Sequence, residues 1–150
     1  MLLREMKLQY VSKRAPIKLQ SVRDSSYVNM LAREIYRLDD NDLEYRECMY
    51  AIYVNIANRP VGWKCVSVGG VSGTVADPKI IFMGAIACGC SSLIMVHNHP
   101  SNRCRPSHTD ITLTKRVNDA ATLLDMTLLD HVIIGPDSTS MYSFADEGLI

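Results

Sequence analysis

The chain has 150 residues, a length that predicts one domain with an interior large enough for a hydrophobic core. Its 16 Lys and Arg residues balance 16 Asp and Glu residues, so the overall charge does not favour nucleic acid as a partner. No apolar run approaches the roughly 20 residues that span a bilayer, and Arg4 places a charge where a signal peptide has its apolar core. The five cysteines, mostly in apolar segments, indicate reduced thiols. We therefore expect a cytoplasmic protein with no membrane partner.

The N-terminal part of the chain predicts one strand and one helix. Met6–Val11 alternates weakly in polarity, which favours an edge strand, and Ser12–Ser21 is polar and basic enough to predict a solvated connector. Asp24 or Ser25 can cap a helix that runs to about Leu38, because apolar residues recur there at helical spacing. The four polar residues that follow end this helix and turn the chain.

The middle of the chain predicts a strand pair followed by a helix. Cys48–Ile56 is rich in Tyr, Ile and Val and predicts a central strand, to which Val61–Val68 pairs back after a turn. A loop from Gly69 to Thr74 leads to a helix with Asp77 at its cap and Pro78 at its first position. This helix is expected to present five residues to the sheet: Ile80, Ile81, Met83, Gly84 and Ala87.

The C-terminal part continues the alternation of strands and helices. Ser92–Val96 is a short apolar run of the buried-strand type, and it completes a strand–helix–strand crossover that should be right-handed. A helix over Ser107–Asp125, a strand over Leu128–Ile134 and a short strand over Ser140–Phe144 follow, and Asp146–Gly148 is expected to be a mobile tail. The fold class is therefore α/β, an α+β arrangement of a mixed sheet covered by helices.

Two histidines at the end of the buried strand indicate a metal site. Residues two apart on a strand point to the same face, so His97 and His99 can direct both imidazoles to one point. Asp110, in the first turn of the next helix, can add a carboxylate. Two imidazoles and one carboxylate suit zinc, and three protein ligands leave a fourth position open, as in catalytic sites.

A simpler reading of the same residues remains open at this point. Ser107 and Asp110 have the spacing of a capping box, with Asp in place of the usual Glu or Gln, so the pair can serve only to start a helix. A lone histidine is more often packed or solvated than a ligand. A His-x-His pair that closes an apolar strand, followed by an acid at a helix start, favours the metal site.

The same motif and the segments around it resemble the bacterial RadC family. His97-x-His99, seven residues, Ser107, two residues and Asp110 match the JAMM metalloprotease motif, also called MPN+ or JAB1. The narrower resemblance rests on four segments in order: His97–Ser101, Pro106-Ser107, Asp110-Ile111 and Leu129–Gly135. Two departures lie between the ligands: Asn102, where the family usually carries Gly, and Arg103-Cys104-Arg105 in place of a milder loop.

The resemblance runs from about Glu44 to Ser143 and implies the cytidine-deaminase-like fold of JAB/MPN domains. We accordingly divide the chain into residues 1–43, a strand and helix of the same domain, and residues 44–150, the RadC-like JAB/MPN part.

The resemblance also implies roles for individual residues. Members of the JAMM class use a zinc ion and an upstream glutamate as general base. Glu47 directly precedes the central strand and lies in a segment similar to the start of the RadC domain, so it is the expected base, with Glu44 as the reserve. Ser107 would help to hold the developing oxyanion. His108 is expected to be exposed, and His131 to be a satisfied core histidine or a support for a metal ligand.

The expected function is zinc-dependent hydrolysis of an amide in a peptide or isopeptide-linked protein. The alternatives are a non-catalytic MPN-type interaction module and an accessory protein of DNA repair or a mobile element. Direct DNA binding is not expected, because the roughly forty residues before the catalytic part lack the Gly-containing hairpin motif of a helix-hairpin-helix. A zinc deaminase is excluded because the sequence has neither His-x-Glu nor Pro-Cys-x-x-Cys. An exposed edge strand would permit a homodimer.

Overall fold

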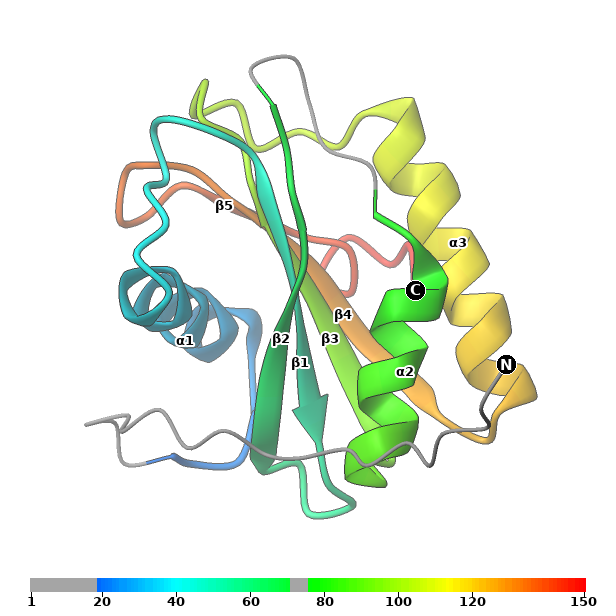
Figure 1. The fold of residues 1–150 in the computed structure, drawn as a ribbon. Helices are drawn as coiled ribbons and strands as arrows, with labels where there is room; N and C mark the ends of the chain where they lie inside the picture. The colour runs from blue at the N-terminus through cyan, green and yellow to red at the C-terminus, as the bar shows by residue number, and fades with distance from the viewer. Residues whose placement is uncertain (1–18, 71–75) are drawn as a thin grey trace, which may run out of the picture.

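The computed structural model describes residues 19–70 and 76–150, which form three helices and five strands (Figure 1). The edge strand predicted at Met6–Val11, and most of the connector and of the loop after Gly69, lie outside these residues. In chain order the elements are α1 (Ser25–Leu38), β1 (Cys48–Val54), β2 (Pro60–Val68), α2 (Pro78–Cys88), β3 (Ser92–Asn98), α3 (His108–Leu123), β4 (Thr127–Ile134) and β5 (Met141–Ser143).

The five strands form one mixed sheet in the order β2-β1-β3-β4-β5. β3 and β4 are parallel, and the other neighbouring pairs are antiparallel. The predicted crossover through α2 connects β2 to β3, which run parallel on either side of β1, and α3 makes a second crossover from β3 to β4. The expected right hand of the first crossover stays a prediction.

Helices cover both faces of this sheet, α1 on one face and α2 with α3 on the other (Figure 1). Alternate residues of β3 divide between the two hydrophobic cores: Leu93 and Met95 pack on the side of α2 and α3, whereas Ile94 and Val96 pack on the side of α1. Every residue of β3 is buried, which explains why the sequence reads there as a continuous apolar run. The predicted mixed sheet covered by helices is confirmed.

The strand that carries the histidines is longer than predicted. The sequence placed its end at Val96, where the apolar run stops, but β3 continues to Asn98. His97 pairs with Met49 of β1 and with Ile133 of β4, so both neighbouring strands hold the extension in place. Polar residues can continue a strand when both of its edges are paired.

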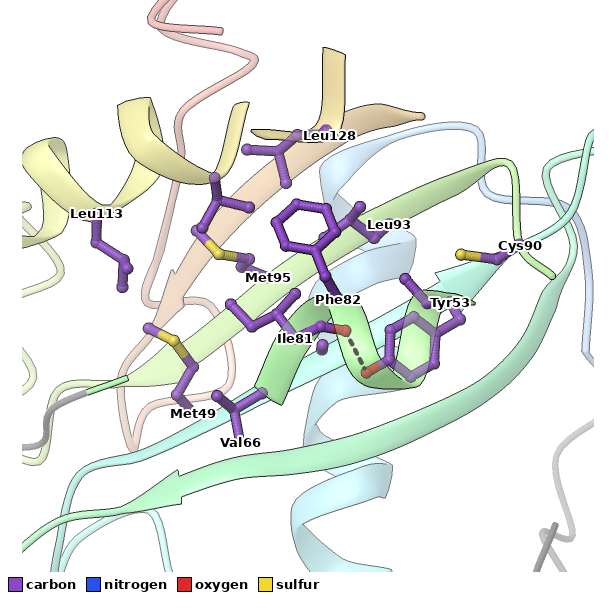
Figure 2. Packing of buried hydrophobic residues seen from close by; sticks show 14 residues of the cluster. Met49, Tyr53, Val66, Ile81, Phe82, Cys90, Leu93, Met95, Leu113 and Leu128 are labelled. Atoms are coloured by element: carbon purple, nitrogen blue, oxygen red, sulfur yellow. Dashed lines mark hydrogen bonds between the residues drawn. The ribbon is translucent and has the colours of Figure 1, made fainter. Parts of the chain in front are cut away.

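The face that α2 presents to the sheet agrees only in part with the predicted one, because Ile80, Ile81 and Gly84 lie toward the core but Met83 does not. Ile81, Phe82 and Ala85 are the buried residues, whereas Met83 is 53% exposed. Figure 2 shows Ile81 and Phe82 among the side chains of the core, with the hydroxyl of Tyr53 donating a hydrogen bond to the Ile81 carbonyl at 3.0 Å. The helix itself carries apolar residues on nearly every face, so the periodicity of its sequence could not identify the buried face.

The C-terminal residues also correct a prediction. Asp146–Gly148, expected to be a mobile tail, forms a hydrogen-bonded turn in which Ser25 Oγ donates to Asp146 Oδ2 at 2.5 Å and Leu149 N donates to Phe144 O at 2.8 Å. Ile150 packs against the core under α2 and α3. The five cysteines are free thiols, as predicted. Within the described part of the chain, no helix combines the length and the apolar character needed to cross a lipid bilayer.

Candidate metal centre

Four side chains from three parts of the sequence meet at one end of the sheet. Glu47 comes from the residue before β1, His97 from β3, His99 from the residue after β3, and Asp110 from the first turn of α3. Each offers one ligand atom, and these four atoms all lie within 4.8 Å of one another. The structure therefore brings together the three residues expected to bind metal and the expected base in a group that could hold a metal ion. Their individual roles stay predictions.

The distances among the three expected ligands are close to those around a tetrahedral zinc ion. The Nε2 atoms of His97 and His99 are 3.0 Å apart. Asp110 Oδ1 lies 3.4 Å from His97 Nε2, and Asp110 Oδ2 lies 3.7 Å from His99 Nε2. Zinc bonds of about 2.0–2.2 Å at tetrahedral angles separate neighbouring ligand atoms by roughly 3.3–3.5 Å. The donor set thus suits zinc, and one shared ion requires the two imidazole nitrogens to move slightly apart and Asp110 to present a single oxygen to it.

His99 presents its Nε2 atom to this centre with a defined protonation of the ring. Its Nδ1 atom is 2.7 Å from the Arg103 carbonyl oxygen, which can only accept a hydrogen bond, so Nδ1 must carry a proton. In the neutral ring Nε2 then has a free lone pair. Arg103 therefore contributes through its backbone carbonyl. The sequence analysis marked this loop only as a departure from the family pattern and did not predict that role.

His97 is fully buried, and a second buried histidine supports it. Burial lowers the pKa of His97 to about 4, against the opposing effect of the Asp110 carboxylate, which favours the charged ring. Its Nδ1 atom is 2.8 Å from His131 Nε2, and His131 Nδ1 is 2.6 Å from Thr114 Oγ1. Burial also lowers the pKa of His131, so both rings are neutral ligand-type imidazoles at neutral pH. His131 was expected to be either a satisfied core histidine or a support for a metal ligand, and its contact with His97 favours the second role.

Asp110 is held by Ser107 in the capping box that the sequence suggested. Ser107 N and Ser107 Oγ donate to Asp110 Oδ2 at 2.7 and 2.6 Å, and Asp110 N donates to Ser107 Oγ at 3.1 Å. Oδ2 is thus engaged by the cap, which leaves Oδ1 facing His97. The capping reading and the metal reading are compatible, because one carboxylate serves both. The hydroxyl proton of Ser107 points to Asp110, so an oxyanion role requires it to turn toward a substrate.

Replacing Ser107 by Ala separates these two roles. We expect the loss of the cap to lower the free energy of unfolding by about 1 kcal/mol. Bound metal should be retained, while turnover should slow by about a hundredfold or more if the hydroxyl stabilises an oxyanion. Chemical denaturation, elemental analysis and single-substrate kinetics measure the three quantities. A less stable variant that turns over at the normal rate would leave Ser107 only its capping role.

Glu47, and not Glu44, lies at the centre. Glu47 Oε1 is 3.6 Å from His97 Nε2 and 4.0 Å from His99 Nε2. Burial raises the pKa of Glu47, and the neighbouring Asp110 carboxylate raises it further, against the opposing effect of His99. Glu44 is exposed and lines a surface hollow beside α1 with Arg33 and Arg37. The geometry favours Glu47 over the reserve.

Asn98 fixes the segment that carries Glu47, a role that sequence reasoning missed. Its fully buried amide donates from Nδ2 to the carbonyls of Leu43 and Arg46 at 2.8 and 2.9 Å. Its Oδ1 accepts from Cys48 N at 2.8 Å and lies 3.0 Å from the Tyr36 hydroxyl. Because side chains alternate along a strand, Asn98 points away from the metal face and toward α1. That alternation was the one signal in the sequence that could have indicated its role.

Asn102, which stands where the family usually carries Gly, has a backbone conformation that glycine adopts freely. Asn102 has a φ of 61°, in the left-handed region that glycine adopts freely and that Asn tolerates best among other residues. Its amide donates to the Asp137 carboxylate and accepts from Asp137 N at 3.4 Å, which ties the loop to the segment after β4. Asn102 can therefore adopt the left-handed backbone conformation that Gly would adopt freely here.

Comparison with known proteins agrees with this geometry. The family model described as RadC-like JAB domain matches residues 23–149. The chain belongs to the RadC-like JAB domain family. The match begins before Glu44, where the resemblance in sequence started, and so includes α1. The five-stranded mixed sheet flanked by three helices agrees with the JAB/MPN fold expected for RadC.

Individual RadC relatives carry names that give no activity. A UPF0758 protein of Porphyromonas gingivalis is 40% identical over 140 residues, which cover 93% of this chain and 61% of the relative. Those of Flavobacterium johnsoniae and Aquifex aeolicus are 37% and 34% identical and cover 69% and 75% of this chain. The chain spans 44% and 48% of the length of these two relatives. The centre and its geometry must therefore carry any assignment of function.

Proposed function

We propose that this RadC-family domain is a zinc-dependent hydrolase that cleaves an amide bond in a peptide or an isopeptide-linked protein. The observation that carries the proposal is the meeting of two imidazole nitrogens and one carboxylate with a second, half-buried carboxylate 3.6 Å from the nearer imidazole. Zinc at such a site acts as a Lewis acid and makes water nucleophilic near neutral pH. His97, His99 and Asp110 would hold it.

Glu47 supplies the proton transfers that amide hydrolysis needs. As the attacking water forms a bond to the carbonyl carbon, Glu47 takes one of its protons. When the carbon–nitrogen bond breaks, the same carboxyl passes that proton to the departing amine, so the products are a carboxylate and an amine. Burial raises the pKa of Glu47, which brings its basicity closer to that required of a general base near neutral pH.

The exposure of the four side chains supports access by a substrate. The His97 side chain is fully buried, whereas Glu47 is 22% exposed, His99 17% and Asp110 11%. The centre therefore opens to solvent on the side of Glu47 and His99. A carbonyl group arriving from that side would meet the expected base first and would not have to displace the buried ligand.

A structural metal site is the second candidate, because Glu47 Oε1 lies nearly as close to the imidazoles as the Asp110 oxygens do. Four protein ligands would close the site and leave no open position for catalysis. The two candidates differ in what happens to bound metal when Glu47 loses its charge.

The proposal is tested by metal analysis together with a cleavage screen. The purified protein is loaded with zinc, dialysed and analysed for metal, then incubated with a peptide library whose products are identified by mass spectrometry. We expect one zinc per chain and cleavage that a chelator stops and added zinc restores. Zinc bound without any cleavage of peptide or isopeptide substrates would favour the structural site, and no zinc at all would refute both.

A further inference from the structure

A chain of buried hydrogen bonds runs from α3 through β4 to the ligand strand. It begins at the Asp110 carbonyl, passes through Thr114 Oγ1 and the ring of His131, and ends at the ring of His97. The three side chains are almost inaccessible: Thr114 is 3% exposed, and His97 and His131 are 0% exposed. The side chains that form these hydrogen bonds are therefore shielded from solvent.

The direction of these hydrogen bonds follows from counting protons. The Thr114 hydroxyl has one proton and donates it to the Asp110 carbonyl at 2.7 Å. At its other contact, 2.6 Å from His131 Nδ1, the Thr114 oxygen must accept, so His131 Nδ1 carries the proton. A neutral His131 then has a bare Nε2, which accepts the proton of His97 Nδ1 at 2.8 Å.

The direction of these hydrogen bonds determines which nitrogen of His97 can bind a metal ion. A neutral His97 that is protonated at Nδ1 has a free lone pair on Nε2, the atom that faces Asp110 and Glu47. If the hydrogen bonds ran in the opposite direction, no proton would lie between Thr114 Oγ1 and the Asp110 carbonyl oxygen. That direction would also place the ring proton of His97 on Nε2, where it blocks the ligand atom. Only one direction both satisfies every contact of the chain from Asp110 to His97 and leaves His97 able to bind. Both Nε2 atoms of the 3.0 Å contact between His97 and His99 then carry lone pairs, as two ligands of one metal ion would.

We propose that His131 is a positioning residue that, through its hydrogen bonds to Thr114 and His97, holds His97 in the tautomer that binds metal. This inference rests on the proposed metal centre and deepens it. His131 does not touch the metal or a substrate. It acts through His97, whose ring it also orients by a tilted contact, with 4.9 Å between ring centroids.

The test compares variants of His131 that differ in hydrogen bonding. In His131→Gln the amide oxygen can stand near the position of Nε2 and accept from His97, whereas His131→Leu offers no acceptor. The zinc dissociation constant, measured by competition with a chromophoric chelator, should rise about tenfold to a hundredfold in His131→Leu. The rise should be clearly smaller in His131→Gln. Thr114→Val, which keeps the shape of the side chain but removes the acceptor, should also weaken binding.

Two controls separate this role from packing. Phe144 stacks on His131 with ring centroids 4.8 Å apart but takes no part in the hydrogen-bond chain. Phe144→Leu should lower the melting temperature with little change in zinc affinity. His108 is exposed and lies outside the metal-ligand cluster, so His108→Gln should behave as wild type.

The tautomer itself is read from the ring ¹⁵N chemical shifts of the metal-free protein, in which His97 Nδ1 should be protonated in the wild type. Equal zinc affinities for wild type, His131→Leu and Thr114→Val would overturn the inference. So would a weakening that Phe144→Leu reproduces, or a His97 ring without a proton on Nδ1. A wild-type protein that takes up no zinc would refute the proposed centre instead, so the two failures are distinguishable. If His131→Leu does not fold, Thr114→Val and the shifts decide.

Discussion

Glu47→Gln is expected to abolish most hydrolysis while leaving zinc bound. The change keeps the shape of the side chain and its ability to form hydrogen bonds but removes the proton acceptor. Hydrolysis of any substrate identified should fall by about a hundredfold to ten-thousandfold, the usual contribution of a general base. Zinc content and thermal stability should change little, because the metal would still be held by two imidazoles and the Asp110 carboxylate. Steady-state kinetics and elemental analysis of the same preparation provide the measurement.

Glu44→Gln is the matched control for this prediction. Glu44 is exposed and does not belong to the metal-ligand cluster, so its variant should be close to wild type in both activity and zinc content. An inactive Glu44→Gln beside an active Glu47→Gln would reverse the assignment of the base. Loss of zinc from Glu47→Gln would identify Glu47 as a fourth ligand and support the structural site. Two fully active variants would exclude a glutamate-assisted mechanism.

Replacement of any of the three expected ligands by Ala should remove zinc and the stability that zinc confers. A ligand at a hundred times its dissociation constant stabilises the folded state by about 2.7 kcal/mol. For the wild type we therefore expect a higher melting temperature in zinc than in chelator. For His97→Ala, His99→Ala and Asp110→Ala this difference should vanish. Elemental analysis and paired thermal melts check both expectations.

The variants also differ among themselves in the absence of metal. His97→Ala removes a fully buried ring that contacts His131, so it should be less stable than wild type even in chelator. His99 is 17% exposed and its loss should cost less. His108→Ala serves as the control for a surface histidine. Wild-type zinc content in all three ligand variants would show that the metal, if bound, lies elsewhere.

The sequence predicted the parts of the centre that depend on local spacing. The two-residue period of a strand placed His97 and His99 on one side, and the capping-box spacing placed Asp110 in the first turn of α3. The choice of Glu47 over Glu44 came from the resemblance and from its position next to the central strand. Pairing of β1 with β3 brings the start of β1 beside the end of β3, which is why that choice agrees with the geometry.

The supporting residues could not be predicted in the same way. Thr114 is a polar residue of α3 whose role depends on how α3 packs against β4. Asn98 occupies the variable position of His-x-His, and its four contacts come from α1, from the segment before β1 and from the first residue of β1. Such roles depend on packing between distant segments. The predicted face of α2 was wrong at Met83 for a related reason, since α2 is apolar on nearly every side and only its packing on the sheet decides that Met83 faces outward.

The origin of the four side chains in separate segments also sets the order of events during folding. Glu47 meets the histidines only after β1 has paired with β3, and His131 reaches His97 only after the chain has passed through α3 and added β4 in parallel. Pairings between distant segments form late, because closing a long loop costs conformational entropy before the new contacts lower the free energy. The three expected ligands lie within residues 97–110, so even an unfolded chain would offer a metal ion two imidazoles and a carboxylate. Only the finished sheet adds Glu47 and the support of His131, so hydrolysis, and not uptake of metal, would count the chains that have completed folding.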